Sequence, residues 1–279
     1  TAEGTIRAAR IGVGAQALTD VVLGVTRNDA ATLFDLGAQF DSAPLSTAGS
    51  ITPDGRGMTV AIDRFTAKPR GIDVALSRPS RIGIADGAVS LSELTINAGN
   101  GRVVLDGQAG TNLALTATVT TLPATLANAF VPNIDAAGAI TGKIVATGTA
   151  SAPVVRYDLQ WSDAQLRQTK AAGIAPFLIE ADGQLQGNVV TLGTTRITNP
   201  DGLSLSANGS LGLTDGGPGL NVNAEIGALP AKLANGFRPG LDAAGTISGR
   251  ASARGTIAAP AADFDLKWAD AATIETRKA

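Results

Sequence analysis

Histidine and cysteine are both absent from this 279-residue sequence. Without histidine the chain has no Ser-His-Asp or Cys-His nucleophile system and no imidazole metal ligand. Without cysteine it has no disulfide framework and no reactive thiolate. Paired carboxylates remain as catalytic candidates, but the acidic residues fall at turns, as Asp54, Asp86 and Asp182 do, or alternate with apolar residues along expected strands. The sequence therefore predicts a protein that is not an enzyme and that uses no cofactor and no metal.

Charged residues are also scarce, at 16% of the chain with a net charge of −2. The basic residues are interspersed with acidic ones and form no stripe, which argues against nucleic acid as a partner. Although 44% of the residues are hydrophobic, no uninterrupted apolar run approaches the roughly 18 residues that a membrane span requires. The first residues lack the basic start and apolar core of a signal peptide. If the protein is exported, the segment that directs export lies outside this sequence.

Short runs of alternating apolar and polar residues fill most of the chain. Met58, Val60 and Ile62 alternate with polar or small residues, and turn signals such as Asp86-Gly87 bound each run of about five to eight residues. Between Leu91 and Leu94 the alternation changes phase, which predicts a β-bulge near Ser92-Glu93. This pattern predicts an all-β protein built on a long antiparallel sheet.

One stretch of the chain occurs twice. Residues 122–163 and 229–270 align without a gap at an offset of 107, and 23 of the 42 aligned pairs are identical. In weaker form the repeat extends upstream, where 82–115 is similar to 180–222. We therefore predict an N-terminal β segment at 1–81, a first repeat unit at 82–179 and a second, truncated unit at 180–279, all within one elongated domain. The second unit stops where the first continues, so we expect the chain to be an internal part of a larger protein.

The repeated stretch opens with the clearest helical pattern in the chain. Leu122, Leu126 and Phe130 are spaced by four residues, and the second copy carries leucine, leucine and phenylalanine at the same spacing. A proline follows the first leucine in both copies, and proline is tolerated in the first turn of a helix. We predict short helices near 122–130 and 229–237 that pack against the end of the sheet and cover it.

The predicted strands share one further property: each is apolar on one face and polar on the other. Such a face needs a cover, because large apolar patches are rare on soluble proteins, and the sequence offers no set of amphipathic helices to provide one. Small residues such as Gly142, Ala146 and Gly249 on the apolar side leave space there. The residues predicted to line this apolar groove are Met58, Val60, Ile62, Val89, Leu91, Leu94, Ile96, Val103, Leu105, Leu113, Leu115, Val155, Tyr157, Leu159, Trp161, Val190, Leu192, Leu203, Leu205, Leu220, Val222, Ile226, Phe264, Leu266 and Trp268.

The order and spacing of these motifs resemble a known family. The run LPATLANAF, then DAAGAITGKIVATGTASAP, YDLQW and GIAPF is similar to the periplasmic repeats of TamB proteins, within the AsmA-like group. The resemblance implies a sheet curled into a U-shaped, taco-like groove with an apolar interior. It also implies a periplasmic location in a Gram-negative bacterium, with an inner-membrane anchor outside this sequence. The implied function is to carry phospholipids between the two membranes and to support outer-membrane biogenesis, with phospholipid acyl chains in the groove and an Omp85-type partner bound through other regions.

Two alternatives to a lipid conduit remain open. One is a structural or adhesin-like β-repeat stalk, and the other is a scaffold for outer-membrane protein assembly that transports no lipid. A groove open along its length favours the conduit, whereas a closed and tightly packed sandwich favours the stalk. An enzyme on a parallel β-helix is disfavoured by the missing histidine and by the antiparallel turn signals.

Overall fold

The computed structural model describes residues 2–13, 16–28, 30–131, 133–213, 219–238, 240–256 and 259–273. These residues form 18 β-strands and a few short helices, and the paired strands run antiparallel. The predicted all-β antiparallel class is therefore confirmed. The chain divides into two compact units, Thr1–Pro132 with Lys143–Pro153, and Asn133–Gly142 with Val154–Ala279.

The first unit contains ten strands and two 3₁₀ turns. Each strand pairs with the next along the chain, except that β5 and β8 each pair with both β6 and β7. The elements are β1 (Ala2–Val13), β2 (Gln16–Arg27), β3 (Thr32–Phe40), β4 (Ala43–Asp54), β5 (Gly57–Ala67), η1 (Pro69–Gly71), β6 (Val74–Leu76), β7 (Ser80–Ala85), β8 (Ala88–Ala98), β9 (Gly101–Ala109), β10 (Asn112–Pro123) and η2 (Ala124–Ala129).

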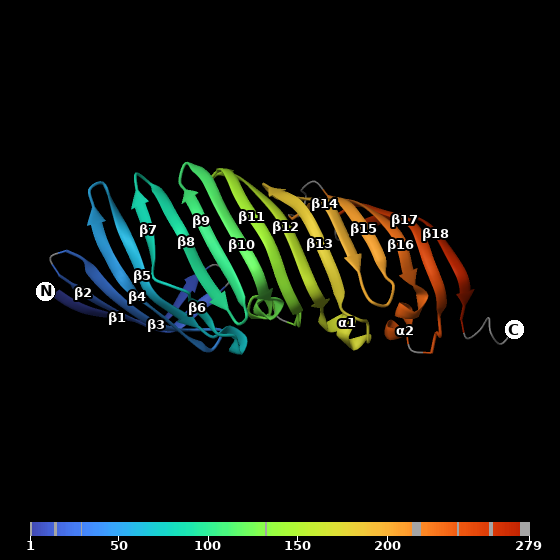
Figure 1. Cartoon of the computed structure of the whole chain (residues 1–279), viewed down its shortest axis with the longest axis horizontal. Coiled ribbons are helices and arrows are strands. Elements are labelled where there is room, and N and C mark those ends of the chain that lie inside the picture. Colours follow the sequence, from blue (N-terminus) through green and yellow to red (C-terminus); the bar gives the residue numbers. More distant parts are fainter. Residues whose placement is uncertain are drawn as a thin grey trace. The chain divides into compact units, whose positions relative to one another are not determined.

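The second unit continues the same design. Its strands from β12 onward each pair with the next (Figure 1). The remaining elements of the chain are β11 (Ala137–Thr149), which the two units share, β12 (Ala152–Gln165), α1 (Arg167–Ala171), β13 (Phe177–Gln186), β14 (Val189–Thr198), β15 (Ser204–Gly212), β16 (Leu220–Pro230), η3 (Ala231–Leu233), α2 (Ala234–Phe237), β17 (Ala244–Gly255) and β18 (Pro260–Ala272).

The turn at Asp86-Gly87 shows how local chemistry sets these hairpins. Ala85 pairs with Ala88, so the loop between β7 and β8 has two residues. Both have positive φ, 49° at Asp86 and 73° at Gly87. Two positive φ values give the turn whose twist matches that of the flanking strands, and aspartate followed by glycine is among the pairs that adopt it at least cost. The sequence prediction of a turn here is confirmed.

The predicted β-bulge is present in β8. The register between β8 and β9 shifts between Leu91 and Leu94, and Glu93 has a φ of 47°. The backbone N–H of Glu93 donates to Asp106 Oδ2 at 3.2 Å. The extra residue therefore has a partner, and the apolar residues on both sides of it remain on one face of the sheet.

Glycines introduce similar irregularities in the second unit. Gly209 in β15 and Gly249 in β17 have φ values of 142° and 141°. A Cβ atom at Gly209 would lie 2.1 Å from Asn221 O, and one at Gly249 would lie 2.1 Å from Asp265 O. Only glycine accommodates both the dihedral angles and this approach of the neighbouring strand.

The predicted helices are present at 124–129 and 231–237, although the first is a 3₁₀ helix and the second is 3₁₀ before it becomes α-helical. Their buried residues are the first ones, Ala124 at 2% exposed and Ala231 at 4%. The phenylalanines are less covered than predicted. Phe130 contacts Phe40 at the end of β3, with ring centroids 5.7 Å apart, yet it is 54% exposed, and Phe237 is 64% exposed. A small side chain fits where the chain turns out of the strand, whereas each ring lies at the end of its helical segment and keeps more than half of its surface exposed.

The sequence analysis did not predict helix α1. Thr169 caps it: its hydroxyl accepts from the Leu166 N–H at 3.0 Å and donates to the Leu166 carbonyl at 2.9 Å. Lys170 Nζ lies 3.1 Å from Asp135 Oδ2 and joins the helix to the loop before β11. In Figure 1, α1 and α2 lie at the same end of the strands of the second unit. The curl of the sheet into a U-shaped groove stays a prediction, as do the predicted unit boundaries after residues 81 and 179.

Candidate apolar binding face

The strand register of the first unit places the predicted groove residues on one face. Directly opposed residues of antiparallel strands project to the same side of the sheet. Val60 pairs with Ile82 and Ile82 with Leu91, and beyond the bulge Leu94 pairs with Leu105. By this reasoning one face carries Met58, Val60, Ile62, Val89, Leu91, Leu94, Ile96, Val103, Leu105, Leu113 and Leu115.

The second unit has a corresponding face. Leu159 pairs with Ala181, Leu192 with Gly209, and Gly209 with Val222. The predicted residues that share this face are Val155, Tyr157, Leu159, Trp161, Val190, Leu192, Leu205, Leu220, Val222, Ile226, Phe264, Leu266 and Trp268. Leu203 differs from the others, because it precedes β15 and is buried at the helical end of the unit.

The side chains on these faces are only partly covered. Most of the predicted residues are half-buried, and Met58, Phe264, Leu266 and Trp268 are 42–73% exposed. Among the described residues no large side chain is fully buried. The most buried apolar positions are small or lie near the helical ends, such as Ala98, Ala164 and Ile174. Within each unit, the apolar face therefore stays partly exposed.

Large and small side chains alternate from strand to strand across the second unit. Gly183, Gly209 and Gly249 lie on β13, β15 and β17, whereas Leu192 and Val222 lie on the strands between them. The Tyr157 ring covers Gly183, so that a Cβ atom there would lie 2.6 Å from the phenol oxygen. The apolar face of the second unit therefore has glycine on β13, β15 and β17 and larger side chains on the strands between them.

One apolar pocket of about 280 Å³ opens where this face meets α1. Trp161 and Ile179, which are opposed across β12 and β13, form one side, and Ile197 and Leu205 continue the wall. The complete lining is Trp161, Ala164, Gln165, Leu166, Thr169, Phe177, Ile179, Ile197, Leu203 and Leu205. All of the exposed lining surface is apolar, so the pocket suits a hydrocarbon group.

A second apolar pocket of about 290 Å³ lies beneath η3 and α2. Trp268 and Ile247, an opposed pair on β18 and β17, form its floor on the sheet side. The helical segment contributes Leu233 and Phe237, and the complete lining is Leu229, Pro230, Ala231, Leu233, Ala234, Phe237, Leu241, Ala243, Ile247 and Trp268. The exposed Phe237 ring thus borders a cavity and does not fill the sheet end.

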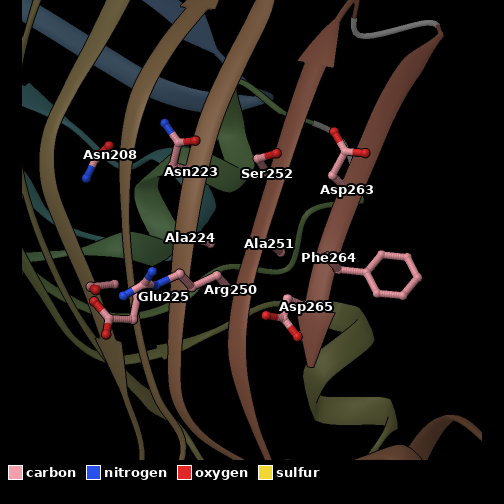
Figure 2. Close-up of a pocket in the computed structure, with 11 residues that line it drawn as sticks. Asn208, Asn223, Ala224, Glu225, Arg250, Ala251, Ser252, Asp263, Phe264 and Asp265 are labelled. Atoms are coloured by element: carbon pink, nitrogen blue, oxygen red, sulfur yellow. The ribbon is translucent and has the colours of Figure 1, made fainter. Parts of the chain in front are cut away.

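The opposite face of the second unit is polar and also hollowed. A wide depression of about 600 Å³ spans β15 to β18 and is lined mainly by Ser, Asn, Asp, Glu and Arg side chains. Figure 2 shows Glu225, Arg250 and Asp265 on this face, at opposed positions of three neighbouring strands, while Phe264 points away from them. Among the described residues, no three potential metal ligands gather closely enough to hold an ion.

Two groups in the second unit have shifted pKa values. Burial, with a smaller contribution from the negative charge of Asp182, raises the pKa of Tyr157, whose hydroxyl donates to the Thr191 carbonyl at 3.4 Å. The hydrogen bond from Lys232, at 2.9 Å, and the one from the Ala175 N–H lower the pKa of Asp201. Asp201 therefore joins η3 to the segment that follows α1.

The sequence analysis missed several residues of the two pockets. Phe177 and Ile179 are two residues apart on β13, so their alternation carried a signal. Ile197 is out of phase with Val190 and Leu192 in the sequence, because the register shifts between Leu192 and Thr195, so its place on the same face carried none. Leu166 and Leu241 lie outside strands and carried none, because their placement depends on how α1 and α2 fold back over the sheet.

No helix among the described residues is both long and apolar enough to cross a membrane. Comparison of the chain with protein-family models, with curated proteins and with solved structures finds no match in any of the three.

Proposed function

We propose that this chain is part of a periplasmic conduit that carries phospholipids between the inner and outer membranes. The observation that supports this most directly is the apolar face of each unit, which stays in register from strand to strand yet remains half-exposed. Such a face offers a hydrocarbon chain a continuous apolar surface that runs across the strands, from each strand to the next.

Hydrocarbon gains about 0.8 kcal/mol for each methylene that leaves water. Because none of the predicted lining residues is charged, an acyl chain can move from strand to strand with little change in its burial. From β12 to β18 there are six strand spacings of about 4.8 Å each, so the second unit provides a path of roughly 29 Å. The polar head group stays in water, and the chain needs no charged site to hold it.

The two apolar pockets support the same proposal. Each is about 280–290 Å³, which is just below the range for small-molecule sites, about 300–1,000 Å³. Pockets of this size accommodate part of an acyl chain and not a whole phospholipid. They are therefore suited to hold the end of a tail while the remainder lies on the open face.

A stalk with a closed core is the weaker alternative. A tightly packed sandwich buries large apolar side chains completely, and the described residues bury none. The periplasmic location, the inner-membrane anchor, the Omp85-type partner and the role in outer-membrane biogenesis rest on the resemblance to TamB proteins and belong to the proposal.

Photo-crosslinking in cells tests the conduit. A photoreactive amino acid is placed at Leu159 or Leu192 on the apolar face, and at Gln160 or Thr191 as matched controls, each adjacent in sequence but exposed on the polar face. We expect phospholipid adducts at the two leucine positions at several times the level found at the controls. Equal labelling on both faces, or none on either, would contradict the proposal.

A further inference from the structure

The segment from Gln165 to Gly173 contains α1 (Figure 1) and borders the apolar pocket at Trp161. The residues on either side of the segment are anchored, since Ala164 is 1% exposed and Ile174 is 6% exposed. Gln165 Nε2 donates to Ile174 O at 3.3 Å and ties the two ends of the segment together. Between these ends, none of the five residues of α1 is buried. The segment is therefore fixed at its two ends and exposed in between.

This segment forms one side of the pocket, and the sheet forms the other. The segment contributes Leu166 and Thr169. The sheet contributes Trp161, Ile179 and Leu205, on β12, β13 and β15. Strand pairing holds the sheet side in place, as the opposed pair of Trp161 and Ile179 shows. Because the segment side is helical and belongs to no strand ladder, a shift of the segment would change access to the pocket without disturbing the sheet.

Polar contacts with the loop before β11 hold the outer side of the segment. Lys170 Nζ donates to both Asp135 O and Asp135 Oδ2 at 3.1 Å. The Arg167 N–H donates to Ile134 O at 3.1 Å, and Arg167 Nη2 donates to Asn133 Oδ1 at 3.4 Å. The Lys170 and Asp135 side chains are 34% and 49% exposed. Water competes for exposed contacts of this kind, so the segment loses little stability when they break.

The C-terminal end of the segment is held more firmly and provides a pivot. Ala172 lies against α2, because a Cβ atom added to Gly236 would be 1.9 Å from Ala172 O. Gly173 follows with a φ of 66°, a conformation that glycine adopts without steric cost. The Lys170 N–H donates to Leu166 O at 3.0 Å and keeps the helical turn together as one unit. The turn can therefore swing about its packed end, as hinged elements do.

We propose that residues 165–173 form a lid that opens to admit the end of an acyl chain into the pocket at Trp161, and that the contact between Lys170 and Asp135 keeps this lid closed. The inference rests on the proposed function, which assigns the pocket to a lipid tail, and it adds the control of entry. Opening breaks exposed polar contacts that water replaces, and it uncovers no buried residue of α1. Segments of this kind open locally more readily than the core of a fold. The polar contacts therefore set the rate at which a tail enters.

The roof of the second apolar pocket is held differently. Ala231 of η3 is 4% exposed, so this roof contains a buried residue. Asn235 joins α2 to Ala243 through two part-buried hydrogen bonds, at 2.8 Å to the Ala243 N–H and 3.2 Å to its carbonyl. Lys170 and Asp135 do not line this pocket. The second pocket is therefore an internal control, in which removal of the Lys170 contact should change nothing.

Tryptophan fluorescence tests the lid, because the chain has two tryptophans and one lines each apolar pocket. A Trp268→Phe chain reports on the first pocket through Trp161, and a Trp161→Phe chain reports on the second through Trp268. The probe is palmitic acid brominated at its terminal carbon, since bromine quenches an indole on contact. Stopped-flow mixing of the full chain with this probe measures the rate of quenching at each tryptophan.

Lys170→Met should raise the rate of quenching at Trp161 about two- to fivefold, the effect expected for the loss of an exposed ion pair. Lys170→Arg, which keeps the charge, should retain the slow rate. Arg156→Met removes the same charge from the polar face of β12, where Arg156 is exposed, and should not speed quenching. Loss of a positive charge weakens attraction to the carboxylate of the probe, so a faster rate cannot come from that attraction. At Trp268, Lys170→Met should leave the rate unchanged.

An unchanged rate at Trp161 in Lys170→Met would overturn the lid and leave the role of the pocket in the proposed function intact. Faster quenching at both tryptophans would indicate a general loosening of the fold and would also overturn the lid. An absence of quenching at Trp161 in every variant would contradict both the lid and the assignment of this pocket to a lipid tail. Circular dichroism of each variant should show unchanged β content.

Discussion

Trp268 occupies the position of Trp161 one repeat later, and both indole nitrogens donate to a backbone carbonyl 24 residues earlier in the chain. Each tryptophan therefore joins its own strand to the start of the preceding one. Both tryptophans border an apolar pocket, but Phe177 and Ile179 of the next strand, β13, line the pocket at Trp161, whereas Trp268 on β18 is 42% exposed. The repeated sequence thus corresponds to a repeated structure.

Replacing Trp161 with phenylalanine should destabilise the chain more than replacing Trp268. In both variants a backbone carbonyl loses its donor, and a net hydrogen bond contributes about 0.5–1.5 kcal/mol. At Trp161 the half-buried ring also loses contacts in the pocket, so we expect a total of about 1–2 kcal/mol there and less than half of this at Trp268. Urea unfolding measures both. Equal losses at the two positions would show that strand β13 adds nothing to the packing of Trp161.

Gly249→Ala should be among the most damaging small substitutions. The new Cβ would lie 2.1 Å from Asp265 O, and a non-glycine residue at such a φ stores about 1–3 kcal/mol of strain. Gly37→Ala is the matched control, since Gly37 also lies within a strand but has no positive φ, and a Cβ atom added there would have no neighbour within 4 Å. We expect the control to change stability by less than about 0.5 kcal/mol. Thermal unfolding of the two variants should separate them clearly.

Leu192→Arg should interrupt lipid movement, whereas Thr191→Arg should not. An acyl chain that passes an arginine on the apolar face must displace water from a fixed charge, which costs several kcal/mol. Thr191 is exposed on the opposite face of the same strand, so it adds the same charge outside the path. Phospholipid bound to the purified proteins, measured by mass spectrometry, should fall at least tenfold in the first variant only. A fall in both would indicate a general effect of charge.

Asp201 should contribute to a loss of stability in acid. Its hydrogen bonds from Lys232 and Ala175 lower the pKa of its carboxyl group in the folded chain, so the unfolded chain binds a proton at higher pH than the folded chain does. The stabilisation is complete above the ordinary carboxyl pKa of about 3.9 and is lost as the pH falls through the lowered value.

The measurement is urea unfolding at a series of pH values between neutral and strongly acidic. Asp201→Asn should flatten the dependence of stability on pH in the acid range, and Lys232→Met should flatten it in the same direction. If neither substitution alters the slope, the ion pair does not couple stability to protonation at this site.

Local chemistry along the chain was sufficient to predict that these segments are strands, and to predict the Asp86-Gly87 turn and the bulge at Glu93. It did not predict the strand lengths, because every strand except β6 and β7 has 9–14 residues and exceeds the expected five to eight. The predicted features depend on the two-residue period of a strand and on φ values that few residues adopt, and both are properties of short segments. The same period also predicted which residues share a face. Successive side chains of a strand point to opposite faces, so a register shift of one residue would move every apolar side chain to the polar side. The two helices were predicted from the repeat, because leucine, leucine and phenylalanine are spaced by four residues in both of its copies.

Contacts between distant segments decided the remaining features. Helix α1 depends on the Thr169 cap and on Lys170 reaching Asp135, 35 residues away, and the pockets exist only because helical ends fold back over Trp161 and Trp268. Leu203 and Leu205 have the same alternation in sequence, yet one is buried beside a helix and the other lies in the ladder. A periodic pattern specifies the side to which a residue points, but burial depends on what the rest of the chain places there.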